Sequence, residues 1–578
     1  MVNQQKVILV GRGPVTLRQS DHVATGGEGS IYRLKTTAVK IFTNPDKMGH
    51  DDMKNKIVAL ANIHHPWIVA PQGIVTDEKH RPIGYFMPYT DGQHLPRFFT
   101  NDFRAQVSFG NAETSDLVDK MRQVIQVAHD FKATVVDGNE YSWLVKFSKN
   151  KTLEPRIVDV DSWQIDRWPA KVIMPSIQDF HTKGFNELSD WFSWGIVTFQ
   201  LYTGIHPYKG TLPGYSRNDF IARMKKNASV FTNGIRLNRA VRDFSCIPPK
   251  LLNWYEQTFQ GTKRSLPQSP LDSGITVSPR VTTMRVAADQ STGLLTFQRL
   301  YNAPVKNPVK KIYDCGVAIL ESNVLINLET GRELGTAKTP GCEVIRTPSG
   351  WLVIELVNEQ IESWHTEGRG DKTTLSLTLD ATGILRFQNR IFVITDQGLT
   401  ELFVQVFKRP VLAIGTSWQA MTAATKFFDG VGIQDTLGAK FLLLPHDSNM
   451  LSYVRMPELD KLNVINAKAA PNFVSIVAID KQGNYHKFEL TLAKDYQSYK
   501  LWRAIVDTPE LVIATLPKGV CATVVEDGQL VIFVPVNGQI QKYKDKTVAT
   551  DEPLFVWDDK VVLIRDGDVC RISVTQKL

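Results

Sequence analysis

Hydrophobic and polar positions follow two different patterns along the chain, and the pattern changes near residue 260. Before that point, short apolar runs typical of strands alternate with longer stretches of helical periodicity. The most apolar helical stretch runs from Trp191 to Thr203, and it is too short to cross a membrane. After residue 280, helical periodicity almost disappears. The pattern therefore predicts an α+β region followed by an all-β region.

A segment rich in Ser, Pro and Gly separates the two regions. It reads GTKRSLPQSPLDSGITVSPR and covers 261–280. This composition disfavours both helix and strand and is typical of a linker. A chain of 578 residues is also too long for one hydrophobic core. We therefore divide it into an N-terminal domain at 1–265, a linker at 266–285 and an all-β domain at 286–578.

One unit recurs through the all-β region: a short apolar run, a polar turn and a second, alternating strand. Asn-Gly, Asp-Gly and related pairs between alternating hydrophobic residues are the strongest local sign of a hairpin. The turns with their second strands are LETGREL (328–334), VNEQIESW (357–364), TDQGLTEL (395–402), HDSNMLSYV (446–454), IDKQGNYHKF (479–488), VNGQIQKY (536–543) and RDGDVCRI (565–572). The apolar runs before them recur about every 40 residues, the length of one four-stranded propeller blade. We predict a seven-bladed β-propeller. A pair of β-sandwiches or an irregular β domain is the alternative, because the spacing is uneven.

Composition and charge narrow the function classes only slightly. The chain is 43% hydrophobic and 22% charged, as in an ordinary soluble globular protein. Its net charge of +8 comes from scattered Lys and Arg, so we do not expect it to bind nucleic acid. Five cysteines without a close pair fit a reducing compartment and argue against a disulfide framework or a zinc site. With no recognisable secretion signal or membrane span, we expect a cytoplasmic location without membrane attachment.

Several motifs follow one another in the first 268 residues. They are ATGGEGSIYRL (24–34), AVKIF (38–42), KIVALANIHHPWIV (56–69), IGYFMPYTDGQHL (83–95), VVDGNEYSWLV (135–145), RIVDVDSWQI (156–165), LSDWFSWGIVTFQLYTGIHPY (188–208) and GTKRSLPQ (261–268). Their order and spacing resemble the eukaryotic-type protein kinase superfamily over residues 18–268. The Asp-x-Asp-Ser form at 159–162 resembles a divergent bacterial and phage branch of kinase-like proteins. The resemblance implies a two-lobed α+β fold that holds a nucleotide.

The resemblance implies a site for ATP and magnesium. The glycine-rich hairpin would close over the phosphates where a Cβ would collide, Lys40 would contact them, and Met87 would be the gatekeeper of an adenine site at 87–90. The implied nucleotide-binding residues are Ala24, Gly26, Gly27, Gly29, Ile31, Ala38, Lys40, Met87, Pro88, Tyr89 and Thr90.

The same resemblance assigns the catalytic and metal-binding positions. Asp137 takes the position of the catalytic base, and Asn139 that of the usual catalytic-loop lysine. Asp159 is the favoured metal ligand, with Asp161 close behind and Ser142 in the position of the metal-binding asparagine. In the helix that follows, Asp190 would bind the catalytic-loop backbone, and Arg264 would close the helical lobe.

The chain departs from the kinase pattern at several positions. Lys56 replaces the glutamate that usually pairs with the strand lysine, so we expect it to repel Lys40 unless it points away, and Asp52 could pair with Lys40 instead. Ser142 would hold a metal only weakly. The segment 174–176 resembles the closing Ala-Pro-Glu motif without its glutamate, which leaves Arg264 without its usual partner.

The retained residues still supply the parts that phosphoryl transfer needs. We therefore expect an ATP- and magnesium-dependent kinase acting on Ser or Thr hydroxyls of a protein, with the propeller binding the substrate or a scaffold partner. One alternative is a catalytically dead pseudokinase that serves as a nucleotide-binding scaffold or a structural component of an assembly; a small-molecule kinase is another. No residue cluster in 280–578 indicates chemistry, and we expect His365, His446 and His486 to be surface loop residues.

Overall fold

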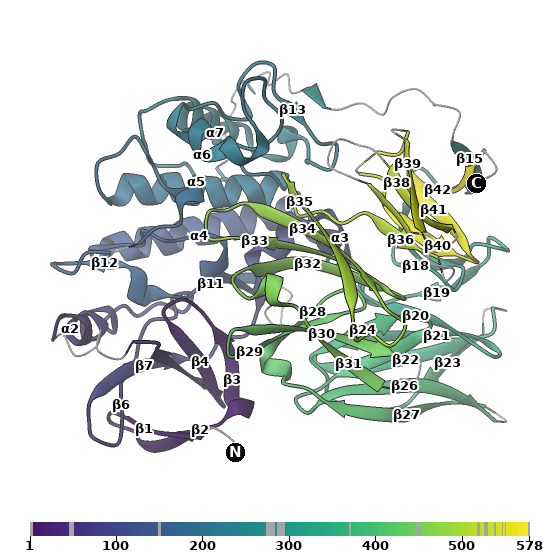
Figure 1. Cartoon of the computed structure of the whole chain (residues 1–578), viewed down its shortest axis with the longest axis horizontal. Helices are drawn as coiled ribbons and strands as arrows, with labels where there is room; N and C mark the ends of the chain where they lie inside the picture. The colour runs from purple at the N-terminus through teal and green to yellow at the C-terminus, as the bar shows by residue number, and fades with distance from the viewer. Residues whose placement is uncertain are drawn as a thin grey trace.

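A computed structural model describes residues 4–44, 51–147, 152–170, 172–272, 284–285, 295–368, 371–407, 409–446, 450–516, 521–524, 530–536, 539–545, 547–549 and 551–575. At 51–52, 284–285, 524, 533–536, 539–544 and 574 it describes only the backbone. The chain is built in three parts: an N-terminal sheet, a helical part and a series of four-stranded sheets (Figure 1).

The N-terminal sheet is antiparallel and seven-stranded, in the order β2-β1-β6-β7-β5-β4-β3, with helix α2 (Asp51–Leu60) beside it. Its strands are β1 (Gln5–Leu9), β2 (Gly13–Leu17), β3 (His22–Thr25), β4 (Gly29–Leu34), β5 (Thr37–Phe42), β6 (Gly73–Thr76) and β7 (Pro82–Pro88). Successive strand residues point to opposite faces. Val39 of β5 therefore packs with β1 and β2, whereas Phe42 packs with Ile57 of α2. Lys40 lies on the same face as Phe42.

The helical part is built around α5 (Glu187–Thr203), in which every residue from Ser189 to Thr203 is buried. Asn186 caps its first turn, and Gly204 ends it in the left-handed conformation at φ 81°. The helix predicted at Trp191–Thr203 is thereby confirmed. The other helices are α3 (Asn101–Gln106), α4 (Asn111–Asp130), α6 (Phe220–Lys225) and α7 (Pro249–Gln260). Short strands complete this part: β8 (Gln93–His94), β9 (Ala133–Thr134), β10 (Trp143–Phe147), β11 (Leu153–Ile157), β12 (Gln164–Ile165) and β13 (Arg236–Leu237).

The C-terminal part contains seven four-stranded antiparallel sheets within the described residues. The first strand of this part, β15 (Leu295–Tyr301), pairs with the last strand, β42 (Asp568–Val574), in the order β15-β42-β41-β40. The other strands of that sheet are β40 (Leu554–Trp557) and β41 (Lys560–Arg565). The remaining sheets contain four consecutive strands each: β16 (Val309–Tyr313), β17 (Val317–Leu320), β18 (Val324–Asn327), β19 (Glu333–Thr336); β20 (Glu343–Thr347), β21 (Gly350–Val357), β22 (Gln360–Thr366), β23 (Lys372–Leu375); β24 (Gly383–Phe387), β25 (Arg390–Ile394), β26 (Gly398–Val406), β27 (Pro410–Gln419); β28 (Thr425–Phe427), β29 (Gly432–Thr436), β30 (Ala439–His446), β31 (Met450–Arg455); β32 (Asn463–Ala470), β33 (Phe473–Ile479), β34 (Tyr485–Leu492), β35 (Tyr499–Val506); β36 (Ile513–Thr515), β37 (Cys521–Val524), β38 (Leu530–Val536) and β39 (Gln539–Asp545).

The predicted hairpins are present in these sheets. At all seven predicted turns the strands on either side pair with each other; the turn residues 447–449 and 537–538 lie outside the described residues. Asn358 and Glu359 form one two-residue turn with positive φ at both positions, and Asp566 and Gly567 form another. The apolar runs of the sequence are interior strands of their sheets, which explains why they do not alternate with polar residues.

Each four-stranded sheet packs against the next through a shared apolar cluster. One such cluster joins β17 to β21 through Val317 and Val353, and another joins β30 to β33 through Leu442 and Val474. Corresponding clusters occur at the other junctions between consecutive sheets. A further cluster, with Ala318 of β17 and Val562 of β41, joins the sheet β16–β19 to the sheet that contains β40, β41 and β42. The series of sheets therefore returns to its start.

The C-terminal sheets contact the helical part through buried polar groups. The Lys209 ammonium donates to the Gly483 carbonyl at 2.8 Å, and the Tyr485 hydroxyl donates to Gln200 Oε1 at 2.8 Å. Between the two parts, residues 273–283 of the predicted linker lie outside the described residues. Its last two residues, Met284–Arg285, form strand β14 and pair in parallel with β13. The domain boundaries drawn from the sequence stay predictions.

All three histidines expected in surface loops lie in strands, so that prediction was wrong: His446 ends β30, and the other two are buried. His365 is 2% exposed in β22, with Nε2 2.8 Å from Thr347 Oγ1, and His486 is 5% exposed in β34, with Nε2 2.8 Å from Asp480. A buried imidazole is stabilised when a neighbour satisfies its ring nitrogens. All five cysteines are free. Among the described helices, none combines the length and apolarity of a membrane span.

Candidate functional site

One large cavity of about 3030 Å³ lies between the N-terminal sheet, the helical part and the C-terminal sheets. All of the site residues predicted from the sequence line it, although they come from segments more than 100 residues apart. These residues are Ala24, Gly26, Gly27, Gly29, Ile31, Ala38, Lys40, Met87, Pro88, Tyr89, Thr90, Asp137, Asn139, Ser142, Asp159 and Asp161. The fold thus brings the candidate nucleotide, metal and catalytic residues together.

The glycine turn between β3 and β4 approaches other backbone closely. The Gly26 N–H donates to the Gly29 carbonyl at 2.9 Å and closes the turn. A Cβ on Gly29 would lie 2.4 Å from the carbonyl oxygen of Ile41, so only glycine fits there. A Cβ on Gly27 would lie 3.4 Å from the ammonium of Lys481, a residue of the β33–β34 turn. The C-terminal sheets therefore reach the turn that would cover a nucleotide.

Lys40 is a buried cation of the cavity, with 5% of its surface exposed. Its ammonium donates to both carboxylate oxygens of Asp161 at 2.8 Å and lies 3.5 Å from Asp159 Oδ1. The Tyr85 hydroxyl donates to Asp161 at 2.7 Å. Burial alone would lower the pKa of Lys40, but the Asp161 carboxylate raises it well above its usual range. Lys40 is therefore charged, and Asp161 is its counter-charge.

The Lys56 ammonium binds a main-chain group of the site. It donates to the main-chain carbonyl of Asp161 at 2.8 Å, and the residue is 5% exposed. Lys40 and Lys56 thus bind different groups of one aspartate, which offsets the repulsion expected between them. The side chain of Asp52, the partner considered from the sequence, lies outside the described residues.

The three predicted metal ligands differ in how available their oxygens are. Asp159 has the left-handed backbone conformation (φ 56°, ψ 36°) and a 55% exposed side chain. The Asp161 oxygens accept hydrogen bonds from Lys40 and Tyr85 instead, and the Ser142 hydroxyl donates to the Asp137 carbonyl at 2.9 Å. Within the described residues no group of three His, Cys, Asp or Glu side chains is arranged to hold a metal. Asp159 is the most available carboxylate of the set.

Asp137 and Asn139 lie in one tight segment before β10. The Met174 N–H donates to Asp137 Oδ1 at 2.9 Å. Burial raises the pKa of Asp137, and the nearby charge of Asp159 acts in the same direction. Asn139 caps the short helix η3 (Glu140–Ser142) by accepting from the Tyr141 N–H at 2.8 Å. Asn139 therefore shapes this segment, and Asp137 presents its carboxylate to the cavity.

Asp190 of α5 fixes the backbone just before Asp137. Its carboxylate accepts the N–H groups of Val135 and Val136 at 2.7 and 2.8 Å, as expected from the sequence. His129 Nε2 also lies 2.9 Å from this carboxylate, a contact that the sequence analysis missed. The central helix thus positions the candidate catalytic segment.

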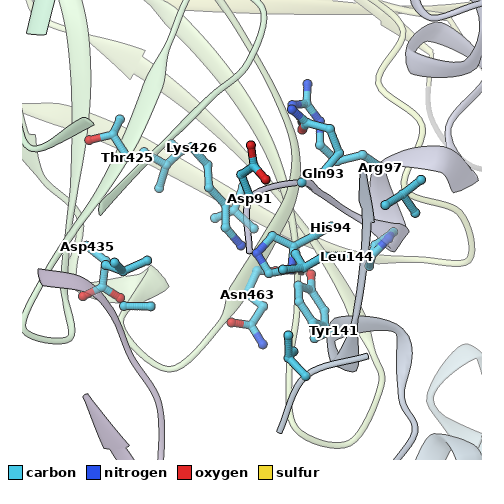
Figure 2. A pocket seen from close by; sticks show the side chains of 18 of the residues that line it. Asp91, Gln93, His94, Arg97, Tyr141, Leu144, Thr425, Lys426, Asp435 and Asn463 are labelled. Carbon is cyan, nitrogen blue, oxygen red and sulfur yellow. Dashed lines mark hydrogen bonds between the residues drawn. The ribbon is translucent and has the colours of Figure 1, made fainter. Parts of the chain in front are cut away.

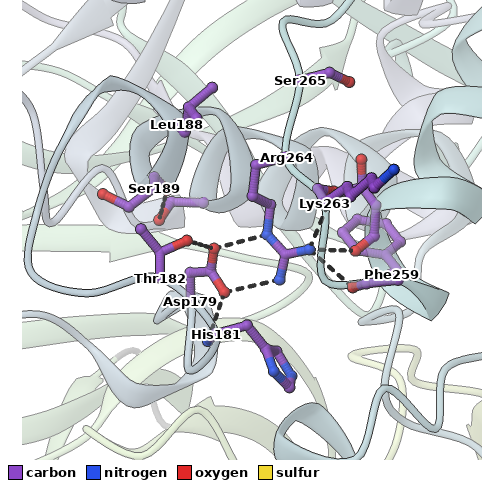
Figure 3. Close-up of polar contacts among 12 residues, drawn as sticks. Asp179, His181, Thr182, Leu188, Ser189, Phe259, Lys263, Arg264 and Ser265 are labelled. Atoms are coloured by element: carbon purple, nitrogen blue, oxygen red, sulfur yellow. Dashed lines mark hydrogen bonds and ion pairs between the residues drawn. The ribbon is translucent and has the colours of Figure 1, made fainter.

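Arg264 has a buried partner after all, at a position that the sequence analysis did not identify. Asp179 accepts two hydrogen bonds from its guanidinium, at 2.7 and 2.8 Å, and both side chains are almost completely buried (Figure 3). Burial would raise the pKa of Asp179, but the hydrogen bonds from Arg264 hold it below its usual value. Asp179 lies five residues after Met174, so this pair holds the segment that contacts Asp137.

The rim that would face adenine is apolar. Ile31, Ala38 and Met87 belong to one cluster with Val69. The Tyr89 N–H donates to the Thr36 carbonyl at 2.8 Å and ties this rim to the sheet. Pro88 and Thr90 lie on either side of Tyr89 and line the cavity.

The sequence analysis missed the part of the cavity that the C-terminal sheets contribute. Lys426 of β28 and Lys481 line it together with His94 of β8 (Figure 2). No local motif marks these residues, because only the packing of distant segments brings them to the cavity.

No protein-family model matches this chain, and no curated protein sequence matches it. Among solved structures, the chain is similar to the autoinhibited serine kinase domain of the giant muscle protein titin, at 14% sequence identity and a TM-score of 0.34. The similarity covers 46% of this chain and 77% of that chain. A TM-score this low decides neither the fold nor the function, which we judge from the residues described above.

The Asp179–Arg264 pair makes a testable contribution to stability. We expect Asp179→Ala to lower the free energy of unfolding by about 3–5 kcal/mol, because it leaves a buried guanidinium without its counter-charge. Chemical denaturation followed by tryptophan fluorescence measures this. The control Asp116→Ala breaks the pair with Lys120, in which Asp116 is 44% exposed, and should cost at most about 1 kcal/mol. Equal losses in the two variants would contradict the assignment.

Proposed function

We propose that residues 1–265 form a protein-kinase-like domain of the divergent bacterial and phage type, and that the protein is an ATP- and magnesium-dependent phosphotransferase. The observation that carries this proposal is the single cavity shared by the glycine turn, the buried Lys40, Asp137 and Asp159. Phosphoryl transfer relies on positioning and on charge stabilisation, for which these groups are suited. The acceptor we propose is a Ser or Thr hydroxyl of a protein segment that enters the cavity.

The residues present fit ATP. Ile31, Ala38 and Met87 offer apolar contacts for adenine. The glycine turn leaves room for phosphates close to the backbone, and Lys40 supplies a permanent positive charge. Asp161 holds that charge in place through two hydrogen bonds of 2.8 Å.

The residues also fit one magnesium ion held loosely. Mg²⁺ usually keeps several waters and needs only one or two protein carboxylates besides phosphate oxygens. Asp159 would supply the first carboxylate, because Asp161 is engaged with Lys40 and Tyr85. The metal, when bound, would neutralise charge on the phosphates.

Asp137 is the residue we propose to orient the acceptor hydroxyl. The Met174 N–H donates to Oδ1 and the Asn139 side chain also bonds the carboxylate, which still has lone pairs that can accept a hydrogen bond from a hydroxyl. Asp190 and the Asp179–Arg264 pair hold the two segments on either side of it. Such rigid support is what a positioned base requires.

We further propose that the C-terminal sheets form a seven-bladed β-propeller that recruits the substrate or another partner. Seven consecutive four-stranded sheets and the apolar clusters between neighbours support this architecture. The pairing of β15 with β42 supports closure, since it ties the two ends of the region into one sheet. The contact of the 480–484 turn with Lys209 means that the propeller would also cover part of the helical lobe.

One observation favours the alternative of a catalytically dead, nucleotide-binding scaffold. Two of the three predicted metal ligands, Asp161 and Ser142, have their oxygens engaged within the protein. A scaffold would bind nucleotide without magnesium-dependent turnover. The two functions therefore differ in turnover rather than in nucleotide binding.

Nucleotide binding is tested by thermal melting of the full chain. We expect ATP with magnesium to raise the melting temperature, because a ligand that binds only the folded state stabilises it. Lys40→Met should abolish the rise, whereas Lys6→Met, which removes an exposed lysine of β1, should leave it intact. Absence of any shift in the unmodified chain would refute a nucleotide site.

Turnover is tested by ADP release or autophosphorylation with full-length protein. We expect Asp137→Asn to lower the rate by about 10²–10⁴-fold, the usual contribution of a positioned base, while the ATP-dependent melting shift persists. Because burial raises the pKa of Asp137, the rate of the unmodified protein should fall with decreasing pH at a higher pH than for an exposed aspartate. Asp116→Asn is the matched surface control. Turnover that is absent from the unmodified protein would favour the scaffold, and turnover unchanged by Asp137→Asn would remove this residue from the mechanism.

A further inference from the structure

A second group of basic side chains lies in the cavity, where the C-terminal sheets meet the helical part. Lys426 comes from β28, His94 from β8 and Arg97 from the short helix η2 (Leu95–Phe99). Figure 2 shows the Lys426 side chain pointing toward the ring of His94, with Tyr141 beside it. We call the space lined by Lys426, His94, Arg97 and Tyr141 the junction pocket.

The basic side chains of the junction pocket form no ion pair among the described residues. Lys426 makes no hydrogen bond there, and its ammonium lies 5.6 Å from the centroid of the Tyr141 ring. His94 Nδ1 is buried without a hydrogen-bond partner. Arg97 bonds only to the neutral Gln93 side chain, at 2.8 Å, and its guanidinium lies over Phe103.

The two carboxylates labelled beside the pocket in Figure 2 are bound to other cations. Asp435 forms an ion pair with Lys440, and Asp91 pairs with Lys146 at 2.6 Å. Burying a cation without a partner is costly, and proteins normally avoid it. An anion that enters the pocket and accepts hydrogen bonds from these side chains would offset this free-energy cost.

We propose that the junction pocket binds a phosphate group carried by the substrate. An ammonium, an imidazole N–H and a guanidinium offer several donors around one space, which suits the oxygens of a phosphate better than the two of a carboxylate. This inference rests on the proposed function, because only a phosphotransferase has a substrate to which the bound phosphate could belong. The molecule that accepts the phosphoryl group would then be one that already carries a phosphate or an equivalent oxyanion.

The junction pocket adjoins the candidate catalytic segment but is built from other residues than the nucleotide site. The Tyr141 N–H donates to Asn139, two residues after Asp137, while the Tyr141 ring lies 5.8 Å from that of His94. The groups proposed for the ATP phosphates, Lys40 and the glycine turn, are not part of this pocket. An oxyanion held here would therefore lie beside the segment that orients the acceptor hydroxyl.

The electrostatics of the junction pocket predict how binding depends on pH. Burial, with the charges of Lys440 and Arg97, lowers the pKa of Lys426 to about 7, and Asp435 opposes this only in part. Burial and the same cationic surroundings lower the pKa of His94 well below its usual value. Lys426 therefore loses its charge as the pH rises through about 7, and oxyanion binding should weaken over the same range.

Isothermal titration of the full chain without nucleotide tests the proposal. Sulfate is the first probe, because it does not titrate between pH 6 and 8 and so isolates the protein's own ionisation. We expect saturable binding that is stronger at about pH 6 than at about pH 8. Lys426→Met should weaken it by about tenfold or more, the contribution of a charge-assisted hydrogen bond. The exposed control Lys306→Met should not change it.

Stability of the unliganded variant separates a ligand site from a structural role. If Lys426 is a partly buried cation without an ion-pair partner, Lys426→Met should keep or raise the melting temperature. A fall in melting temperature together with unchanged sulfate binding would overturn the proposal.

Two further titrations, with phosphoserine and with saturating ATP, test whether the bound oxyanion belongs to the substrate or to the nucleotide. Phosphoserine is the substrate-type probe, and it should bind like sulfate and remain bound in the presence of saturating ATP. Binding of sulfate but not of phosphoserine would overturn the substrate assignment. Displacement by ATP would place the pocket in the nucleotide site and overturn its separate role. Because no arm requires turnover, a catalytically dead protein would still give a clear result.

Discussion

The ammonium of Lys40 lies almost wholly out of water, and the structure of the cavity depends on how that charge is balanced. An isolated buried charge costs several kcal/mol or shifts its pKa until it is neutral. Asp161 supplies the counter-charge with its carboxylate, and its main-chain carbonyl accepts a hydrogen bond from Lys56 of α2. This pairing brings the segment 159–162 against the sheet and leaves Asp159 exposed toward the cavity. It also explains why the side chain of Asp161 is buried while that of Asp159, two residues earlier, is exposed.

Much of the fold and of the candidate site could be predicted from the sequence, because the signals involved are local. The hairpin turns of the C-terminal sheets depend on residues such as Asn358 and Gly567, whose conformations a turn of that type requires. The buried helix α5 is marked by its own apolarity. Lys40 and Asp137 were predicted from short motifs, and both line the cavity.

What the sequence could not supply depends on contacts between segments far apart in the chain. Asp179 replaces a missing glutamate for Arg264 because of where its loop packs, and nothing in its local sequence marks it. His365 and His486 read as isolated loop residues, yet both are buried in strands beside hydrogen-bond partners. The junction pocket joins His94 and Lys426, which are separated by more than 300 residues. The arrangement of cations there follows from the packing of the two halves.

Hydrogen exchange of the full chain, with and without ATP and magnesium and followed by mass spectrometry, tests the central claim most directly. The claim is that the cavity around Lys40 is one nucleotide site formed by distant segments. We predict slower exchange in peptides that cover 24–31, 87–90 and 157–162 together, because one ligand would order all three. Protection confined to one of these segments, or found only in the C-terminal sheets, would contradict the account.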